Sequence, residues 1–293
     1  MAKSINLFLM DNDASGRIKC TLANWTGLAY KIPRLYLDKC KDRQDLKQSG
    51  VYFLFGTSEE TGKDVVYVGQ AGIRKNGEGI LGRLIEHQKN PDKDYWTEAV
   101  VFTTSNNSFG PTEISYLENR FTTMATAAKR YQVKNGNEPN PGNITEEKEC
   151  ELEEYIQNAR LIMGTLGHKV FEAFAPAEKA SPFYEEEPKA EELELFCRGK
   201  NSSASGQLTT EGFVVFAGSK ISPSVSKSCP DYVKKLRAEY QDKIGEDQSL
   251  LEDILFNSPS AASDFVLGYS SSGNLSWKSC EGMCLRELIE DFG

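Results

Sequence analysis

The chain has 293 residues, of which 39% are hydrophobic and 26% charged, and its formal net charge at pH 7 is -9. This composition excludes a fibrous or disordered chain and is typical of a globular protein with room for one large domain or two ordinary ones. Residues 1–135 hold 19 Lys and Arg against 15 Asp and Glu, whereas residues 136–293 hold 15 against 28. The acidic excess lies in the second half, so the first half can still face a polyanion.

The N-terminal segment MAKSINLFLMDNDASG contains an apolar run that ends at Asp11, which is too short for a signal-peptide core. No later stretch approaches the roughly 18 apolar residues of a membrane span. We therefore expect a cytoplasmic protein without a membrane partner. The seven cysteines are scattered without a CxxC pair, which predicts free buried thiols rather than disulfides or a zinc site.

Residues 1–49 are expected to form an N-terminal lead-in strand and extension. INLFLMD is typical of a strand, and Pro33 within TLANWTGLAYKIPRLYLDK argues against a continuous helix there. We expect this segment to pack on the domain that follows it.

Residues 50–173 show the clearest periodicity. Two runs of β-branched and aromatic residues predict a hairpin, a third run follows a short helix, and two helices with apolar stripes come after it. In chain order these elements are the strands GVYFLFG and DVVYVGQ, the helix GILGRLIEHQK, the strand EAVVFTTS, the helix PTEISYLENRFTTMATAAKRYQ and a helix from about Glu146 to Leu166. This order predicts an α+β domain with a small antiparallel three-stranded sheet flanked by helices.

A boundary is expected at residues 174–192, FAPAEKASPFYEEEPKAEE, where prolines and an acidic run interrupt all periodicity. We interpret this segment as a solvated linker. Residues 193–293 then form a second small α+β domain. Its expected elements are a hairpin, a helix near DYVKKLRAEYQDKIG, a Ser-capped helix in NSPSAASDFVLG, and a final strand and turn at GNLSWKS.

Four short features of the first domain occur in a distinctive order. GVY at residues 50–52 and YVG at residues 67–69 lie in the hairpin, Arg83 lies in the short helix, and Glu118 lies in the long helix. In order and surroundings, residues 50–135 resemble the GIY-YIG nuclease family, with valine at the centre of each tripeptide where isoleucine is usual. The resemblance implies a divalent-metal-dependent endonuclease acting on nucleic acid, DNA more than RNA, in bacterial or phage restriction, repair or defence.

Phosphodiester hydrolysis needs an activated water, positive charge on the phosphate and relief of the leaving group. We predict Tyr52 as the general base, because a nearby cation favours the phenolate. Glu118 offers the single carboxylate that suits Mg²⁺ or Mn²⁺. Arg83 would hold the scissile phosphate through its planar donors.

Further residues complete the predicted site. Tyr67 would position the phosphate or water. His87 lies four residues after Arg83 on the same helical face, so it would contact substrate or share the proton transfer. The expected substrate-binding residues are Gly69, Gln70 and Asn135.

Other roles for these residues and for the fold remain open. Tyr52 and Tyr67 suit cross-strand packing in an ordinary sheet, and Arg83 and Glu118 suit surface charges. The same fold could serve as an inactive module that binds nucleic acid or a protein. The oligomeric state is also open: one active site cuts one strand, so cleavage of both strands of a duplex would call for a homodimer or for two successive events.

The second domain resembles a DUF4357-like module of unknown function that is often appended to bacterial nucleases of this kind. The resemblance rests on GFVVFAGSKI, ILFNSPSAASDFVLG and SWK. It implies nothing about chemistry.

Overall fold

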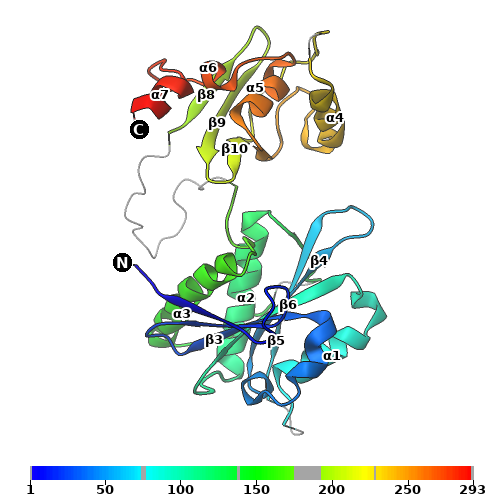
Figure 1. Ribbon diagram of the computed structural model, residues 1–293, viewed down its shortest axis with the longest axis vertical. Coiled ribbons are helices and arrows are strands. Elements are labelled where there is room, and N and C mark those ends of the chain that lie inside the picture. The colour runs from blue at the N-terminus through cyan, green and yellow to red at the C-terminus, as the bar shows by residue number, and fades with distance from the viewer. Residues whose placement is uncertain (1, 74–76, 137–138, 175–192, 228, 292–293) are drawn as a thin grey trace. The chain divides into compact units, whose positions relative to one another are not determined.

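The computed structural model describes residues 2–73, 77–136, 139–174, 193–227 and 229–291 (Figure 1). The chain divides into two compact units, Met1–Ala173 and Phe174–Gly293. Each unit has its own β-sheet. Of the expected linker, every residue after Phe174 lies outside the described residues.

The sheet of the first unit has the strand order β1-β2-β3-β6-β4-β5-β7. All neighbouring strands are antiparallel except β5 and β7, which pair in parallel through two residues each. The strands are β1 (Ile5–Leu9), β2 (Ile18–Leu22), β3 (Gly27–Pro33), β4 (Gly50–Thr57), β5 (Asp64–Ala71), β6 (Trp96–Thr104) and β7 (Gln132–Val133).

The predicted sheet of three strands was too small, because the sheet has seven strands. The expected strands β4, β5 and β6 are the centre of the seven-stranded sheet, and residues 1–49 supply β1, β2 and β3 to it. β3 pairs with β6 from Gly27 opposite Thr104 to Pro33 opposite Glu98. Without β3, the buried strand β6 would leave a row of backbone groups unpaired, which is costly inside a protein.

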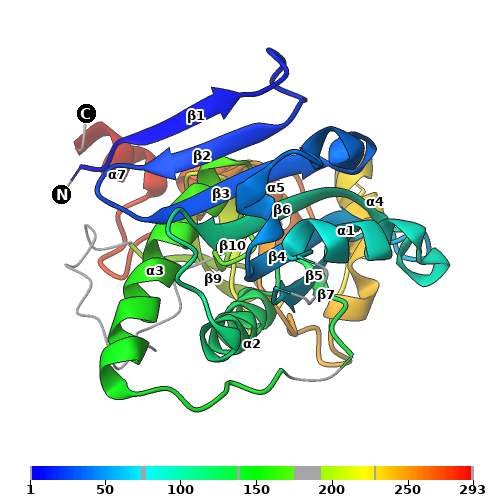
Figure 2. The same ribbon diagram turned by 90° about the horizontal axis from the view of Figure 1, so that it is seen from below.

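The two faces of this sheet have different covers. Helices α2 (Pro111–Ala128) and α3 (Glu146–Thr165) pack on the face that carries Phe53 and Phe102, which we call the aromatic face. Helix α1 (Ile80–Lys89) and the short 3-10 helices Arg34–Cys40 and Gln44–Lys47 pack on the opposite face. Figure 2 shows α1 on one side of the sheet and α2 and α3 on the other.

The opposite face, which we call the tyrosine face, carries Tyr30, Tyr52 and Tyr67. The division follows from strand alternation, because successive side chains of a strand point to opposite faces. Val51 and Phe53 of β4 therefore lie in the aromatic-face core, while Tyr52 lies in the core on the other side.

Local signals explain where the covering helices begin. Pro111 occupies the first turn of α2, and the Glu113 carboxylate accepts a hydrogen bond from the backbone N–H of Gly110 at 3.0 Å. The hydroxyl of Thr145 accepts from the backbone N–H of Lys148 at the start of α3. The predicted apolar stripe of α2 is confirmed, with Ile114, Leu117, Phe121 and Ala128 buried and Met124 partly buried.

The second unit has a four-stranded antiparallel sheet in the order β11-β10-β9-β8, with helices packed against it. Ser258 caps α5 as predicted, since its hydroxyl accepts from the backbone N–H of Ala261. The elements are β8 (Leu195–Arg198), β9 (Ser203–Thr209), β10 (Gly212–Val215), α4 (Asp231–Glu239), β11 (Ile254–Phe256), α5 (Pro259–Leu267), α6 (Gly273–Ser276) and α7 (Leu285–Asp291).

The prediction of a strand at GNLSWKS was wrong. Residues 273–276 form the short helix α6, and Lys278 makes isolated bridges to Phe196 and Cys284. The helical turn is closed by hydrogen bonds from the backbone N–H groups of Leu275 and Ser276 to the Ser272 carbonyl. Gly273 packs directly on the backbone of Pro259, where an added Cβ would lie 2.2 Å from the carbonyl carbon. Trp277 then enters the core against Phe213.

Two further predictions concern the state of the cysteines and the absence of a membrane-spanning segment. All seven cysteines are free, with Cys150 and Cys280 exposed and the others buried. In the part of the chain that the structure describes, no helix is both long and apolar enough to cross a bilayer.

Candidate active site

The centre of the tyrosine face is a hydrogen-bonded pair of buried side chains. Tyr52 projects from β4 toward α1, and His87 lies on the inner side of α1. The Tyr52 hydroxyl and His87 Nε2 are 2.7 Å apart. The exposed fractions of the two residues are 1% and 3%. The structure therefore places His87 behind Tyr52, where it can exchange a proton with the phenol.

Gly69, the glycine of the second tripeptide, lies directly against the side chain of Tyr52. Tyr52 and Gly69 are direct cross-strand partners in β4 and β5. A Cβ added at Gly69 would lie 2.4 Å from the Tyr52 hydroxyl, so any larger residue would displace the phenol. Gly69, predicted as a substrate-binding residue, has in the structure the role of making room for Tyr52.

Tyr67 extends the cluster toward solvent. Its ring is half-buried, with its centroid 6.3 Å from that of Tyr52 and 5.5 Å from that of His87. Burial is the main reason that the pKa of Tyr67, like that of Tyr52, is raised above its usual value near 10. Both phenols therefore stay protonated at neutral pH in the free protein.

Arg83 lies one helical turn before His87, with a side chain that is 38% exposed. Its Nη1 donates to the Glu86 carboxylate at 2.8 Å. Its charge and hydrogen bonding also lower the pKa of Tyr52 and of Tyr67, against the larger effect of burial. The guanidinium is thus close to both phenols and partly open to solvent, which suits a contact to an anionic ligand.

Lys93 is a site residue that the sequence did not reveal. It ends the 3-10 helix Pro91–Lys93, and its Nζ lies 3.1 Å from the centre of the Tyr67 ring, a cation–π contact. Lys93 forms no ion pair with any residue that the structure describes. Within the sequence PDKD a lysine is typical of a solvated turn, so no local signal separates it from other surface charges.

The cations and the burial together set the protonation of this cluster. Burial, followed by the charges of Lys93 and Arg83, lowers the pKa of His87 to about 4. Burial, followed by the charge of Arg83, lowers the pKa of Lys93 to about 8. His87 is therefore neutral at pH 7, and Lys93 titrates close to physiological pH.

Glu118 approaches the cluster from the other cover of the sheet. It lies on α2 at the border between core and solvent, as predicted, and its Oε2 accepts from Gln70 Nε2 at 2.9 Å. Burial raises the pKa of Glu118, while the hydrogen bond from Gln70 and the charge of Arg83 lower it. The charge of Glu118 in turn raises the pKa of both Tyr52 and Tyr67, so the carboxylate belongs to the same electrostatic neighbourhood.

Asn135 has a backbone role. Its Oδ1 accepts from the Val68 N–H at 3.0 Å, and its Nδ2 donates to the Val68 carbonyl at 2.8 Å. The side chain thus continues the pairing of β7 with β5 by one further step. Asn135 was predicted as a substrate-binding residue, and the structure shows its amide holding the β5 edge beside Tyr67.

The donor set around Glu118 fits one kind of metal ion. No cluster of three or more His, Cys, Asp or Glu suitable for a metal occurs among the described residues. Among the described residues, Gln70 is the one that hydrogen-bonds the Glu118 carboxylate, through its side-chain amide to Oε2 and through its backbone. Mg²⁺ keeps several waters and binds through one or two carboxylates together with substrate phosphates, so a single carboxylate suits it.

The comparisons with known proteins concern the second unit. A family model described as a domain of unknown function (DUF4357) matches residues 195–289. This match confirms the resemblance noted for that half of the chain. No curated protein and no solved structure matches the sequence. The nuclease resemblance of the first unit stays a prediction.

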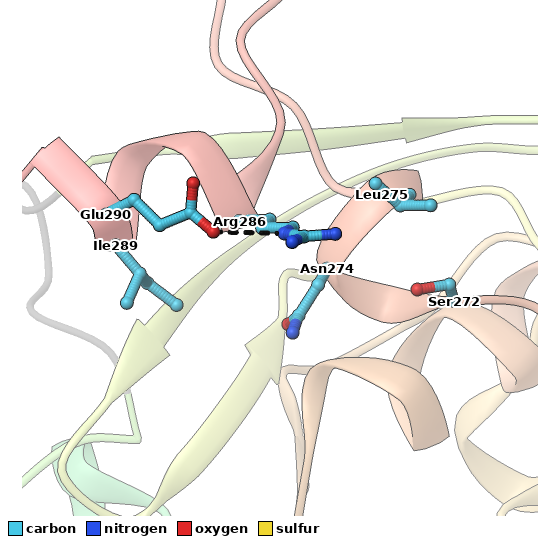
Figure 3. A pocket seen from close by; sticks show the side chains of 6 residues that line it. All are labelled: Ser272, Asn274, Leu275, Arg286, Ile289 and Glu290. Carbon is cyan, nitrogen blue, oxygen red and sulfur yellow. Dashed lines mark hydrogen bonds and ion pairs between the residues drawn. The ribbon is translucent and has the colours of Figure 1, made fainter.

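The second unit has a surface hollow between α6 and α7 (Figure 3). Its charged side chains, Arg286 and Glu290, bond each other at 3.0 Å and are each about two-thirds exposed. Leu275 and Ile289 line the rest, with no buried polar group among them. The hollow therefore has none of the features that gather around Tyr52.

Proposed function

We propose that the first unit is a divalent-metal-dependent nuclease that hydrolyses the phosphodiester backbone of nucleic acid, with DNA the expected substrate. The observation that carries the proposal is the buried Tyr52–His87 pair, flanked by two cations, Arg83 and Lys93. An ordinary sheet packs tyrosines without placing a neutral imidazole behind one phenol and a lysine, which ion-pairs with no described residue, over the ring of another. Such clusters of strongly shifted pKa values are typical of functional sites.

The proton transfer begins at Tyr52. Because burial keeps the phenol protonated, Tyr52 acts as a base by passing its own proton to His87 Nε2 while its oxygen accepts a proton from the attacking water. The water oxygen forms the new bond to phosphorus, and the leaving oxygen departs with the electron pair of the broken bond and takes a proton from solvent. His87 holds the proton as imidazolium, with the Tyr52 phenol restored.

Substrate binding would strengthen His87 as a proton acceptor. In the free protein the charges of Lys93 and Arg83 help to depress the pKa of His87. A phosphate bound between those two cations neutralises this effect and raises the pKa of the imidazole. The site thus becomes basic when substrate arrives, which couples phosphate recognition to activation of the water.

Glu118 would hold Mg²⁺ through its carboxylate, which Gln70 orients by a hydrogen bond to Oε2. The ion, when bound, supplies positive charge to the phosphate and the leaving oxygen. The acidity of the second unit does not oppose this assignment, because the cations that face the site belong to the first unit.

The direct test is cleavage of labelled single-stranded DNA, double-stranded DNA and RNA with Mg²⁺, Mn²⁺ or EDTA. We expect metal-dependent cleavage that is lost in Glu118→Gln and retained in Glu154→Gln, a matched change at an exposed carboxylate of α3. If the wild-type protein binds these substrates but cleaves none of them, the site is a binding module instead. If it neither binds nor cleaves, the nucleic-acid assignment is wrong.

A further inference from the structure

The outermost strand of the first unit, β1, has the features of an interface. Among the strands of the described residues only β2 pairs with it, and it lies at the outer edge of the sheet (Figure 2). Its five residues, INLFL, carry no charge and no proline, and Leu7, Phe8 and Leu9 are 41%, 60% and 42% exposed. Natural proteins usually protect such an edge with charges, prolines or bulges, because it can pair with another chain.

The alternation of hydrogen bonds along β1 shows which of its backbone groups can pair with another strand. The Ser4 carbonyl accepts from Ala23, and the Met10 N–H donates to Arg17, so the even-numbered residues face β2. In an antiparallel ladder the alternate residues point the other way. Ile5, Leu7 and Leu9 therefore present their N–H and C=O groups to the open edge, apart from the Leu9 carbonyl, which also accepts from Asn12.

We propose that β1 pairs antiparallel with β1 of a second copy, about a twofold axis that passes beside Leu7. In this register Leu7 faces Leu7 of the second copy, and Ile5 faces its Leu9. Every outward backbone group of the strand then meets a partner of the right kind. The Leu9 carbonyl can take part as well, since a carbonyl oxygen accepts two hydrogen bonds.

The side chains favour the same register. Ile5, Leu7 and Leu9 lie opposite Leu22, Cys20 and Ile18 of β2, all of which are buried in the aromatic-face core. Pairing two copies joins their apolar side chains into one row and removes Leu7 and Leu9 from water.

The inference does not depend on nuclease activity, because it uses no residue of the candidate active site.

The test is the mass of the full chain in solution, measured by light scattering or sedimentation over a range of concentrations. We expect a dimer for the wild-type protein and for Leu35→Lys, a control at a side chain that is 89% exposed on another element. Leu7→Lys and Leu7→Glu should each be monomeric, because each places two like charges across the axis. An equimolar mixture of the two variants should form a dimer again, since opposite charges then face each other.

Folding is controlled by circular dichroism and by Leu7→Pro. The Leu7 N–H points away from β2, so proline there removes an outward donor without breaking the β1–β2 ladder, and it should also give a folded monomer. A wild-type monomer at all concentrations, a dimer that persists in Leu7→Lys, or a mixture that stays monomeric would each overturn the proposal. Persistence of the dimer would assign it to another surface of the chain.

Discussion

Both faces of the seven-stranded sheet carry buried aromatic side chains, but the two faces differ in the polar groups around those side chains. On the aromatic face, Phe53 packs against Phe102, Phe121 and Phe171 with ring centroids 5.3 to 6.0 Å apart. On the tyrosine face the adjacent residue of β4, Tyr52, packs as tightly but ends in a hydroxyl bonded to His87. The long helices α2 and α3 cover the first face, and one short helix with 3-10 turns covers most of the second.

This difference indicates where chemistry can arise in a small fold. A face covered by two long helices excludes water and gains from apolar burial alone. A face with a thinner cover leaves Tyr67 and Arg83 partly open to solvent next to the buried Tyr52 and His87, at a cost in desolvation that appears as shifted pKa values. We expect substitutions on the aromatic face to change stability and those on the tyrosine face to change function.

The largest effect on stability should come from Phe53→Ala. The ring is fully buried among four other aromatic rings, and its removal should lower the free energy of unfolding by about 3–5 kcal/mol. Denaturant unfolding measures the change, with Leu35→Ala as the exposed control, expected within about 0.5 kcal/mol of wild type. A loss below about 1 kcal/mol for Phe53→Ala would mean that the aromatic face is not the main core.

A smaller effect should follow from acid. The pKa of His87 is about 4 in the folded protein against about 6.5 when unfolded, so the unfolded chain binds the extra proton between these values. Stability is therefore lost as the pH falls from 6.5 toward 4, by at most about 3 kcal/mol. His87→Gln does not titrate, so its unfolding free energy should fall less over that range. Parallel curves for the two proteins would contradict the buried neutral imidazole.

The smallest effect concerns Lys93. Lys93→Met should weaken binding of duplex DNA in EDTA and reduce the slope of log affinity against log salt concentration by about 0.9, the effect of one lost phosphate contact. Lys89→Met, at an exposed residue near the end of α1, is the matched control and should keep a larger slope. Equal slopes for the two variants would remove Lys93 from the substrate-binding surface.

Local patterns in the sequence predicted β1, β4, β5, β6 and the three α-helices of the first unit, but not β2, β3, β7 or the extent of the sheet. Strand alternation and helical stripes define β4, β5, β6, α1, α2 and α3 without reference to distant residues. The pairing of Gly27 with Thr104 joins segments far apart in the chain, and nothing in either segment specifies the other. Residues 1–49 were therefore expected to pack on the domain, whereas they extend its sheet.

The candidate site was predictable to the extent that spacing on one element controls it. The four-residue interval between Arg83 and His87 predicted both on one face of α1. The pairing of Tyr52 with Gly69 was not predicted, because it depends on the register of the hairpin. Lys93 was missed because its position depends on how a turn folds back over Tyr67. The backbone role of Asn135 depends equally on a contact across 67 residues.

The most direct test of the central claim compares two buried tyrosines of the same face. Tyr30 lies on β3, and its hydroxyl bonds Asp45 and Arg43, away from His87. Tyr52→Phe and Tyr30→Phe each remove one buried hydroxyl, which should lower stability by a similar amount, about 1–3 kcal/mol. Rates of cleavage in a single turnover, measured on folded protein, should fall about 10²- to 10⁴-fold for Tyr52→Phe and stay near wild type for Tyr30→Phe. Equal rates for the two variants would contradict the assignment of Tyr52 as the residue that activates the water.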